Sequence, residues 1–304
     1  MFNYILLMAY TDPSTQSLTN SRKSKWGMDH HLTAESLYHR GSIFFVKKEW
    51  EQSLSCLELA LFTFKKIGIN SALKANALYM IGCAQEKLDR RVKALVSLNE
   101  ALVLHRERKG PNHIDVARTL RRIGVLYQSK EDYSNSQSSL NQSLRISVDC
   151  LGSNHKEVLQ VYEYLAETLC RDLQYSEGLS HIMKAITIHE GHHGKSLDLA
   201  RCYGLHGTIL DQAGKTLDEV IDCYNKSKDL YVSLLQDKHC NAETHEDYMT
   251  FASIVFKLAM AQERSGKDSL ATKNYACKFV KTHIRIIYNS SVAKSNFFSH
   301  ASFS

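Results

Sequence analysis

Apolar residues recur along this chain at helical spacing, and the same pattern returns every 42 residues. From Ile114 to Ser129 they fall three or four positions apart, which is the spacing of one buried helix face. The polar stretch 130–133 predicts a tight turn, and a second apolar helix face follows it. This helix should end at Gly152, because glycine readily adopts the left-handed conformation that terminates helices. One unit is therefore predicted to be a pair of antiparallel helices.

Several independent series of residues share this period. Glycines recur at the predicted outer loops, at Gly68, Gly110, Gly152 and Gly194. Large residues recur on the second helix of each pair, at Leu98, Leu140, Ile182 and Tyr224. Small residues recur three positions later, at Ala101, Ser143, Ala185 and Ser227. Small residues let two helices approach closely, and large ones fill the space between pairs. The pattern predicts an all-α array in which neighbouring pairs bury each other's apolar faces.

Less regular copies of the unit extend in both directions, giving about six units. Residues 33–280 are predicted to form the repeat domain. Residues 1–32 are expected to be a flexible N-terminal flank, and residues 281–304 the end of a C-terminal helix with a flexible tail, because both ends are rich in Ser, Thr and Asn.

These units resemble the tetratricopeptide repeat, whose signature places a Leu-Gly-like pair and an aromatic residue on the first helix and small residues on the second. The best copy consists of Leu120, Ile123-Gly124, Tyr127, Tyr133, Ser136, Leu140 and Ser143. The resemblance covers about residues 34–280. It implies a right-handed superhelical solenoid of stacked antiparallel helix pairs, and a protein that binds other proteins.

The 42-residue period is similar to that of the kinesin light chain subgroup. The matching string is Gly110, His113, Asp115, Val116, Ala117, Thr119, Leu120, Leu126 and Tyr127. Kinesin light chains carry paired asparagines on the first helix, where this chain has Arg121-Arg122 and Glu163-Tyr164. This chain also lacks a heptad coiled coil. Cargo recognition and a motor subunit role of that kind are therefore not expected.

The resemblance implies that the first helix of each unit lines a concave groove. The exposed groove positions expected to contact a partner are Asn76, Tyr79, Arg118, Arg121, Arg122, Glu163 and Glu167. The three arginines share one helix face, and guanidinium groups bind carboxylates in a bidentate manner. The expected partner is a protein or peptide, either acidic or offering its C-terminal carboxylate. The alternative for this surface is a solvated helix face.

Composition limits the other function classes. The net charge of +6 is mild and the charges are interleaved, so no nucleic acid partner is expected. No run of apolar residues approaches the length of a membrane span, and residues 1–10 lack the basic start of a secretory signal, so no membrane partner is expected. The eight cysteines never approach metal-binding or redox spacing. Reduced cysteines and a cytoplasmic location are expected.

One string resembles an enzyme motif. His189, Glu190 and His193 match the H-E-x-x-H pattern of zinc proteases, which requires both histidines on one face of a continuous helix. Gly191 lies inside the string and Gly194 follows it, so the helix is expected to end there and to leave exposed loop histidines. We expect no enzyme activity, no metal and no cofactor. The alternatives are a structural or regulatory part of a larger assembly, and a metal-dependent hydrolase built on this string.

Overall fold

The computed structural model describes residues 12–27, 30–68, 72–236, 245–267, 269, 270 and 272. Within these ranges the regular elements are all helical, and there is no strand. The chain divides into two compact units, residues 1–153 and residues 154–304. No helix in the described part of the chain is both long and apolar enough to cross a membrane.

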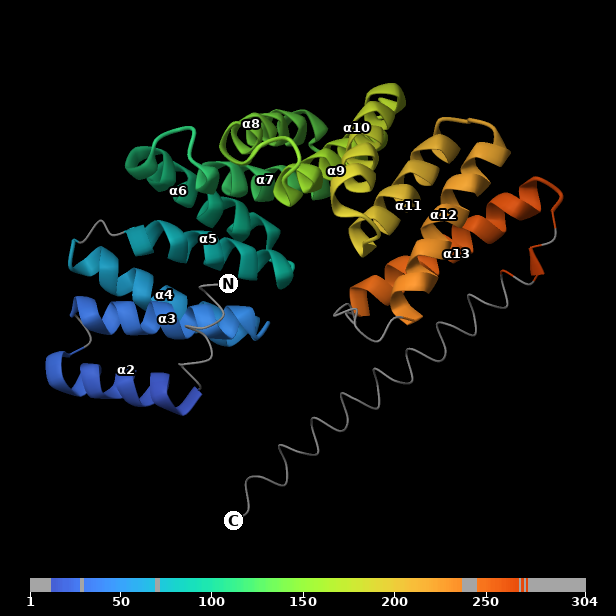
Figure 1. The fold of residues 1–304 in the computed structure, drawn as a ribbon. Helices are drawn as coiled ribbons and strands as arrows, with labels where there is room; N and C mark the ends of the chain where they lie inside the picture. The colour runs from blue at the N-terminus through green and yellow to red at the C-terminus, as the bar shows by residue number, and fades with distance from the viewer. Residues whose placement is uncertain are drawn as a thin grey trace, which may run out of the picture. The chain divides into compact units, whose positions relative to one another are not determined.

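The first unit contains three helix pairs preceded by one extra helix (Figure 1). Its helices are α2 (Asp12–Trp26), α3 (His31–Val46), α4 (Trp50–Lys66), α5 (Ala72–Lys87), α6 (Arg91–Lys109), α7 (Ile114–Ser129) and α8 (Tyr133–Leu151). The pairs are α3 with α4, α5 with α6, and α7 with α8. The first helices α3, α5 and α7 also contact one another in succession.

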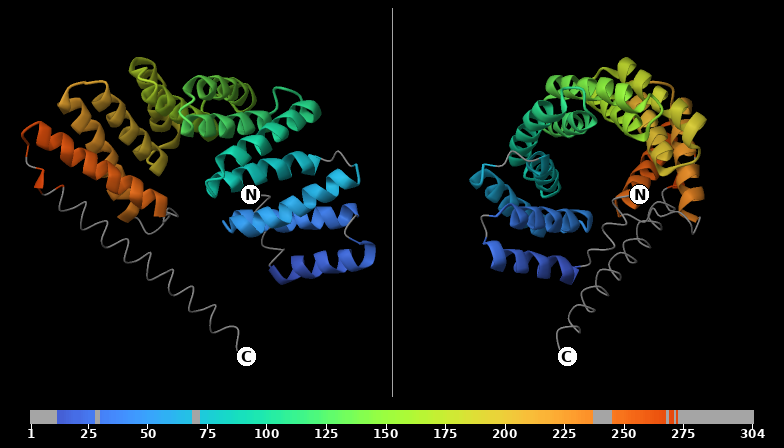
Figure 2. Two further views of the ribbon diagram at one scale, coloured as in Figure 1. Left: turned by 180° about the vertical axis from the view of Figure 1, so that it is seen from behind. Right: turned by 60° about the vertical axis from the view of Figure 1, so that its left-hand side comes forward.

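The second unit repeats this arrangement, as the two further views show (Figure 2). Its helices are α9 (Lys156–Arg171), α10 (Tyr175–Ile188), the π-helical turn η1 (His189–His193), α11 (Leu197–Gln212), α12 (Leu217–Gln236) and α13 (His245–Arg264). Helix α9 pairs with α10, and α11 pairs with α12. The first helices α9, α11 and α13 are again in successive contact.

The residues that repeat every 42 positions form the contacts within each pair. Gly124 of α7 lies so close to α8 that an added Cβ would stand 2.7 Å from Cγ of Leu140. Gly82 meets Leu98 in the same way at 2.6 Å. Ser143, from the small series, is buried and donates a hydrogen bond of 2.7 Å to the carbonyl of Ala117 on α7. The expected close approach of paired helices is confirmed.

The loops between pairs depend on glycine for a conformational reason. Gly110 and Gly152 cap α6 and α8 with φ of 87° and 83° and ψ of 159° and 157°. Only glycine occupies this backbone region without strain. The following helices begin with a capping histidine, since His113 accepts a hydrogen bond from the backbone N–H of Asp115 and His155 from that of Glu157.

The structure differs from the expected flanks. Helix α2 lies within the segment expected to be flexible, and it packs on α3. Arg22 fixes it there by donating hydrogen bonds of 2.8 Å to Ser36 Oγ and 3.1 Å to the carbonyl of Leu32. This contact could not be predicted from the apolar pattern, because α2 has almost no apolar face. Three predictions concern segments outside the described residues. These are the absence of a secretory signal at residues 1–10, most of the second helix of the sixth repeat, and the C-terminal tail.

Candidate functional site

In the first unit, several candidate groove residues lie close together, and two of the candidate arginines form ion pairs with carboxylates of the same unit. Tyr79 of α5 lies near Arg121 and Arg122 of α7. Burial raises the pKa of Tyr79 to about 12, although the two arginines act in the opposite direction. Arg122 Nη1 lies 3.4 Å from Glu86 Oε1, and Arg118 Nη1 lies 3.3 Å from Asp115 Oδ1. Much of the arginine charge is therefore neutralised within the unit.

Asn76, the remaining candidate in this unit, is half-buried and in contact with Tyr38 of α3. It joins two first helices of the unit, as its register position predicts. None of the five candidates of this unit lines the cavity described next.

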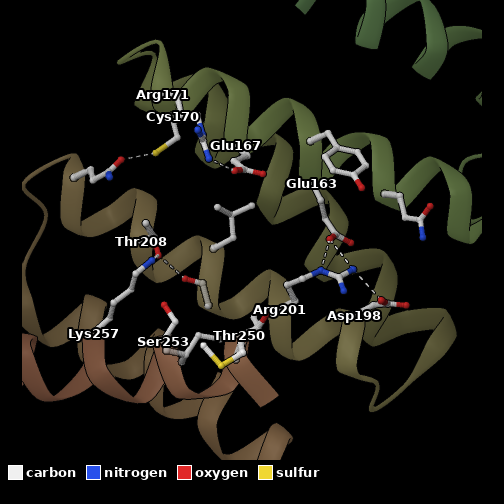
Figure 3. A pocket seen from close by; sticks show the side chains of 17 residues that line it. Glu163, Glu167, Cys170, Arg171, Asp198, Arg201, Thr208, Thr250, Ser253 and Lys257 are labelled. Carbon is white, nitrogen blue, oxygen red and sulfur yellow. Dashed lines mark hydrogen bonds and ion pairs between the residues drawn. The ribbon is translucent and has the colours of Figure 1, made fainter. Parts of the chain in front are cut away.

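The second unit contains a cavity of about 900 Å³ between its first helices α9, α11 and α13 (Figure 3). Two of the predicted residues, Glu163 and Glu167, line it. Each of these three helices contributes residues at positions i, i+3 and i+7, so the same helix face is used three times. These nine residues are Gln160, Glu163 and Glu167, then Arg201, Gly204 and Thr208, then Thr250, Ser253 and Lys257.

Sequence reasoning missed the residues from α11 and α13, although a signal was present. The fifth unit has a one-residue deletion before Gly207, so its groove positions lie 41 rather than 42 residues after those of α9. The residue of α11 equivalent to Glu167 is therefore Thr208, 41 positions later. The connection before α13 is longer, so the residue of α13 equivalent to Thr208 is Lys257, 49 positions later.

A charged network forms one wall of the cavity. Arg201 Nη2 lies 3.0 Å from Glu163 Oε2 and 2.8 Å from Asp198 Oδ1 (Figure 3). Outside this view, Lys156 Nζ lies 2.7 Å from Asp198 Oδ2. Burial works against the charge of Arg201, but the two carboxylates overcome it and raise the pKa of Arg201. Burial likewise opposes ionisation of Asp198, and the cations of Lys156 and Arg201 hold its pKa below the usual value. These groups stay ionised and hold α9 and α11 together.

The opposite wall carries a cation with a different environment. Lys257 of α13 donates a hydrogen bond of 3.0 Å from Nζ to Thr208 Oγ1 (Figure 3). Among the residues that the structure describes, no carboxylate forms an ion pair with it. Glu167, the nearest predicted acid, is instead 2.8 Å from Arg171 on its own helix. Burial lowers the pKa of Lys257, and nearby acidic groups offset part of this effect.

The rest of the lining combines hydroxyl groups with apolar side chains. Thr250 and Ser253 lie beside Lys257 on the same helix (Figure 3). Leu205, Met249 and Ile254 supply the apolar part. Cavities of this size with a few polar groups among apolar ones are typical of binding sites.

The H-E-x-x-H string does not form the site of a zinc protease. Helix α10 ends at Ile188, and the string occupies the π-helical turn η1. Glu190 accepts a hydrogen bond from the Tyr203 hydroxyl, and His193 Nε2 lies 2.7 Å from the carbonyl of Asn154. The expectation of exposed histidines is wrong for His189, which is only 2% exposed. Its register position explains this burial, because the residues one and two periods earlier, Ser147 and His105, are buried as well.

Comparison with known proteins identifies the fold. No protein family model matches the sequence, and no curated protein matches it. Among solved structures, the apo form of RapI has a TM-score of 0.65 and 15% identity, with 89% of each chain covered. BtubC (BKLC) from P. vanneervenii has a TM-score of 0.62 and 14% identity, covering 76% of this chain and 92% of its own.

A third solved structure is similar to this chain and contains a bound molecule. It is a Rap protein complexed with Competence and Sporulation Factor, with a TM-score of 0.55 and 15% identity, and the match covers 84% of this chain and 65% of that protein. At this level of identity the likeness concerns the fold. Together with the repeated helix pairs and their 42-residue register, it shows that this chain is a tetratricopeptide-type helical repeat protein.

Proposed function

We propose that the chain is a non-catalytic protein-interaction module, and that the cavity of the second unit binds a peptide segment of a partner protein. The observation that carries this proposal is the register of the lining, in which three successive first helices contribute the same face to one cavity. The Rap protein complexed with Competence and Sporulation Factor supports it, because a protein of similar fold is known in complex with another molecule.

The charges of the cavity favour a ligand with a carboxylate. Glu163, Asp198 and Glu167 are neutralised by arginines, so they hold the walls in place. Lys257 has no such partner among the described residues, and its ammonium group can form a charge-assisted hydrogen bond. The ligand carboxylate would come from an acidic side chain or from a C-terminus. The apolar surface of Leu205 and Ile254 would bind a neighbouring apolar side chain.

The location of the protein is proposed on independent grounds. The six described cysteines are free thiols, and five of them are buried. Free thiols persist in a reducing compartment, which supports action in the cytoplasm.

Selection from a random peptide library displayed with free C-termini would test the proposal. The affinity of the best synthetic peptide would then be measured by fluorescence polarisation on the whole protein and on Lys257→Gln. A charge-assisted hydrogen bond contributes about 1.5 to 3 kcal/mol, so the dissociation constant should rise by about 10- to 100-fold.

The matched control is Lys184→Gln, because Lys184 is an exposed lysine of α10 that does not line the cavity. Its affinity should equal that of the unaltered protein. Equal affinity of Lys257→Gln, combined with loss of binding in Arg121→Glu, would contradict the proposal. It would place the peptide on the candidate surface of the first unit.

A further inference from the structure

Three side chains that commonly bind metal ions meet in the core of the second unit. They are Glu163 of α9, His189 of η1 and Cys202 of α11. One donor atom from each lies within 4.8 Å of the other two. All three residues are buried, with exposed fractions of 8% for Glu163, 2% for His189 and 0% for Cys202.

Three polar atoms of this cluster have no hydrogen-bond partner among the described residues. Among the described residues, neither ring nitrogen of His189 has a hydrogen-bond partner, and neither has Oε1 of Glu163. His189 Nε2 and Glu163 Oε1 lie 3.9 Å apart, which is too long for a hydrogen bond. Leaving a buried polar group unpaired is costly, and native proteins rarely do so without an ion, a water molecule or a functional reason.

A hydrogen bond from Arg201 holds one oxygen of Glu163 and leaves the other available to a metal ion. Arg201 donates this hydrogen bond of 3.1 Å from Nε to Oε2 of Glu163, and Oε1 remains the unpaired oxygen. Outer hydrogen bonds of this kind orient metal ligands in known sites. Glu163 and Arg201 also line the cavity, which offers a route for an ion to reach the cluster.

The donor set points to a particular class of ion. One imidazole nitrogen, one thiolate sulfur and one carboxylate oxygen suit zinc and similar borderline transition metals rather than magnesium or calcium. Tetrahedral coordination at the usual zinc bond lengths places such donors roughly 3.3 to 3.6 Å apart. The cluster, whose donor atoms lie within 4.8 Å of one another, would need to contract by about 1.5 Å at most, which changes of side-chain rotamer can supply.

We propose that Glu163, His189 and Cys202 form a binding site for a divalent transition metal ion of the zinc class, with a fourth position open to water. The thiol of Cys202 loses its proton to solvent as the sulfur–metal bond forms. The ion links α9, η1 and α11 through one centre. This site differs from the H-E-x-x-H string, because it uses only His189 of that string and takes its other ligands from neighbouring first helices.

The repeat register supplies an internal comparison. Two periods earlier, His105 is buried in the same register position as His189. In the register of the repeats, the positions equivalent to Glu163 and Cys202 are there Tyr79 and Thr119, which cannot complete a zinc site. The ligand set is therefore particular to the second unit, and His105 provides a matched control.

Titration of the whole, tag-free protein with cobalt(II), followed by displacement with zinc(II), tests the site without any peptide. The protein should bind one cobalt ion and show a thiolate-to-cobalt charge-transfer absorption that zinc abolishes. The absorption should be lost in Cys202→Ser, and cobalt affinity should fall at least 10-fold in His189→Asn and in Glu163→Gln. Zinc should also raise the melting temperature of the unaltered protein by several degrees, and circular dichroism confirms that each variant is folded.

Two control variants separate this site from other metal-binding groups. His105→Asn removes the register-equivalent histidine, and His192→Asn with His193→Asn removes the exposed histidines of η1. Both should keep the cobalt spectrum. A spectrum that survives in Cys202→Ser, one that is lost with the exposed histidines, or the absence of a thiolate band in the unaltered protein would overturn the proposal.

Discussion

The close approach of paired helices can be tested by adding a single methyl group at Gly124. A Cβ at this position would stand 2.7 Å from Cγ and 3.0 Å from Cδ2 of Leu140, which is nearer than real contacts allow. Leu140 is fully buried, so it has little room to move. Overpacking of this kind costs about 1 to 3 kcal/mol.

Gly124→Ala also gains about 1 kcal/mol of helix propensity, which offsets part of the cost. Because Leu140 is fully buried, the overpacking cost should lie in the upper part of its range, about 2 to 3 kcal/mol, and the expected net loss in the free energy of unfolding is about 1 to 2 kcal/mol. In urea this corresponds to a midpoint lowered by roughly 0.5 M, measured by circular dichroism.

The next helix pair, α9 with α10, indicates which second substitution should offset the cost of Gly124→Ala. One period later the equivalent residues are Ala166 and Ile182, which are both fully buried in one apolar cluster. Adding Leu140→Ile to Gly124→Ala should therefore recover about 1 kcal/mol, whereas Leu140→Ile alone should be slightly destabilising. Unchanged stability of Gly124→Ala, or strictly additive effects in the double variant, would refute this account of helix pairing.

Three further predictions concern turns, charge and thiols. Leu173 is 71% exposed and has a φ of 62°, so Leu173→Gly should raise the free energy of unfolding by up to about 1 kcal/mol, whereas Asp172→Gly, inside the helical φ range, should lower it in the same urea assay. Burial lowers the pKa of Lys257, so the affinity for a carboxylate peptide should fall as the pH rises towards about 10. Lys257→Arg should remove this decline, because arginine stays protonated at that pH. An affinity of the unaltered protein that does not change with pH would contradict a role for the positive charge of Lys257 in binding. Burial raises the pKa of Cys202 well above its usual value, so iodoacetamide at neutral pH should alkylate the exposed Cys150 first, as peptide mass spectrometry would show; equal rates would contradict the burial of Cys202.

The sequence predicted the helices where their apolar spacing was regular. The expected helix from Ile114 to Ser129 agrees with α7, and the expected turn at 130–133 differs from the observed one only because α8 already begins at Tyr133. The glycines Gly110 and Gly152 end α6 and α8 with positive φ as predicted, but their ψ values of 159° and 157° differ from the left-handed helical conformation that was expected. Helix α2 was not predicted, since polar contacts of Arg22 rather than an apolar stripe attach it to α3.

The candidate site was predicted only in part, for two physical reasons. Glu163 and Glu167 were found because α9 keeps the 42-residue register, whereas Arg201 and Lys257 follow a deletion and a longer connection. Ion pairs between helices are also invisible in a linear pattern. The sequence therefore could not show that Arg122 of α7 is paired with Glu86 of α5 while Lys257 has no carboxylate partner among the described residues.

The central claim, that a peptide carboxylate binds Lys257 in the cavity of the second unit, is tested most directly by a double-mutant cycle. The affinity of one selected peptide is measured with its carboxylate intact and with that group amidated, on the unaltered protein and on Lys257→Gln. We predict that amidation weakens binding about 10- to 100-fold in the unaltered protein and has almost no effect in Lys257→Gln. An equal loss on both proteins would show that the carboxylate binds elsewhere and would contradict the account.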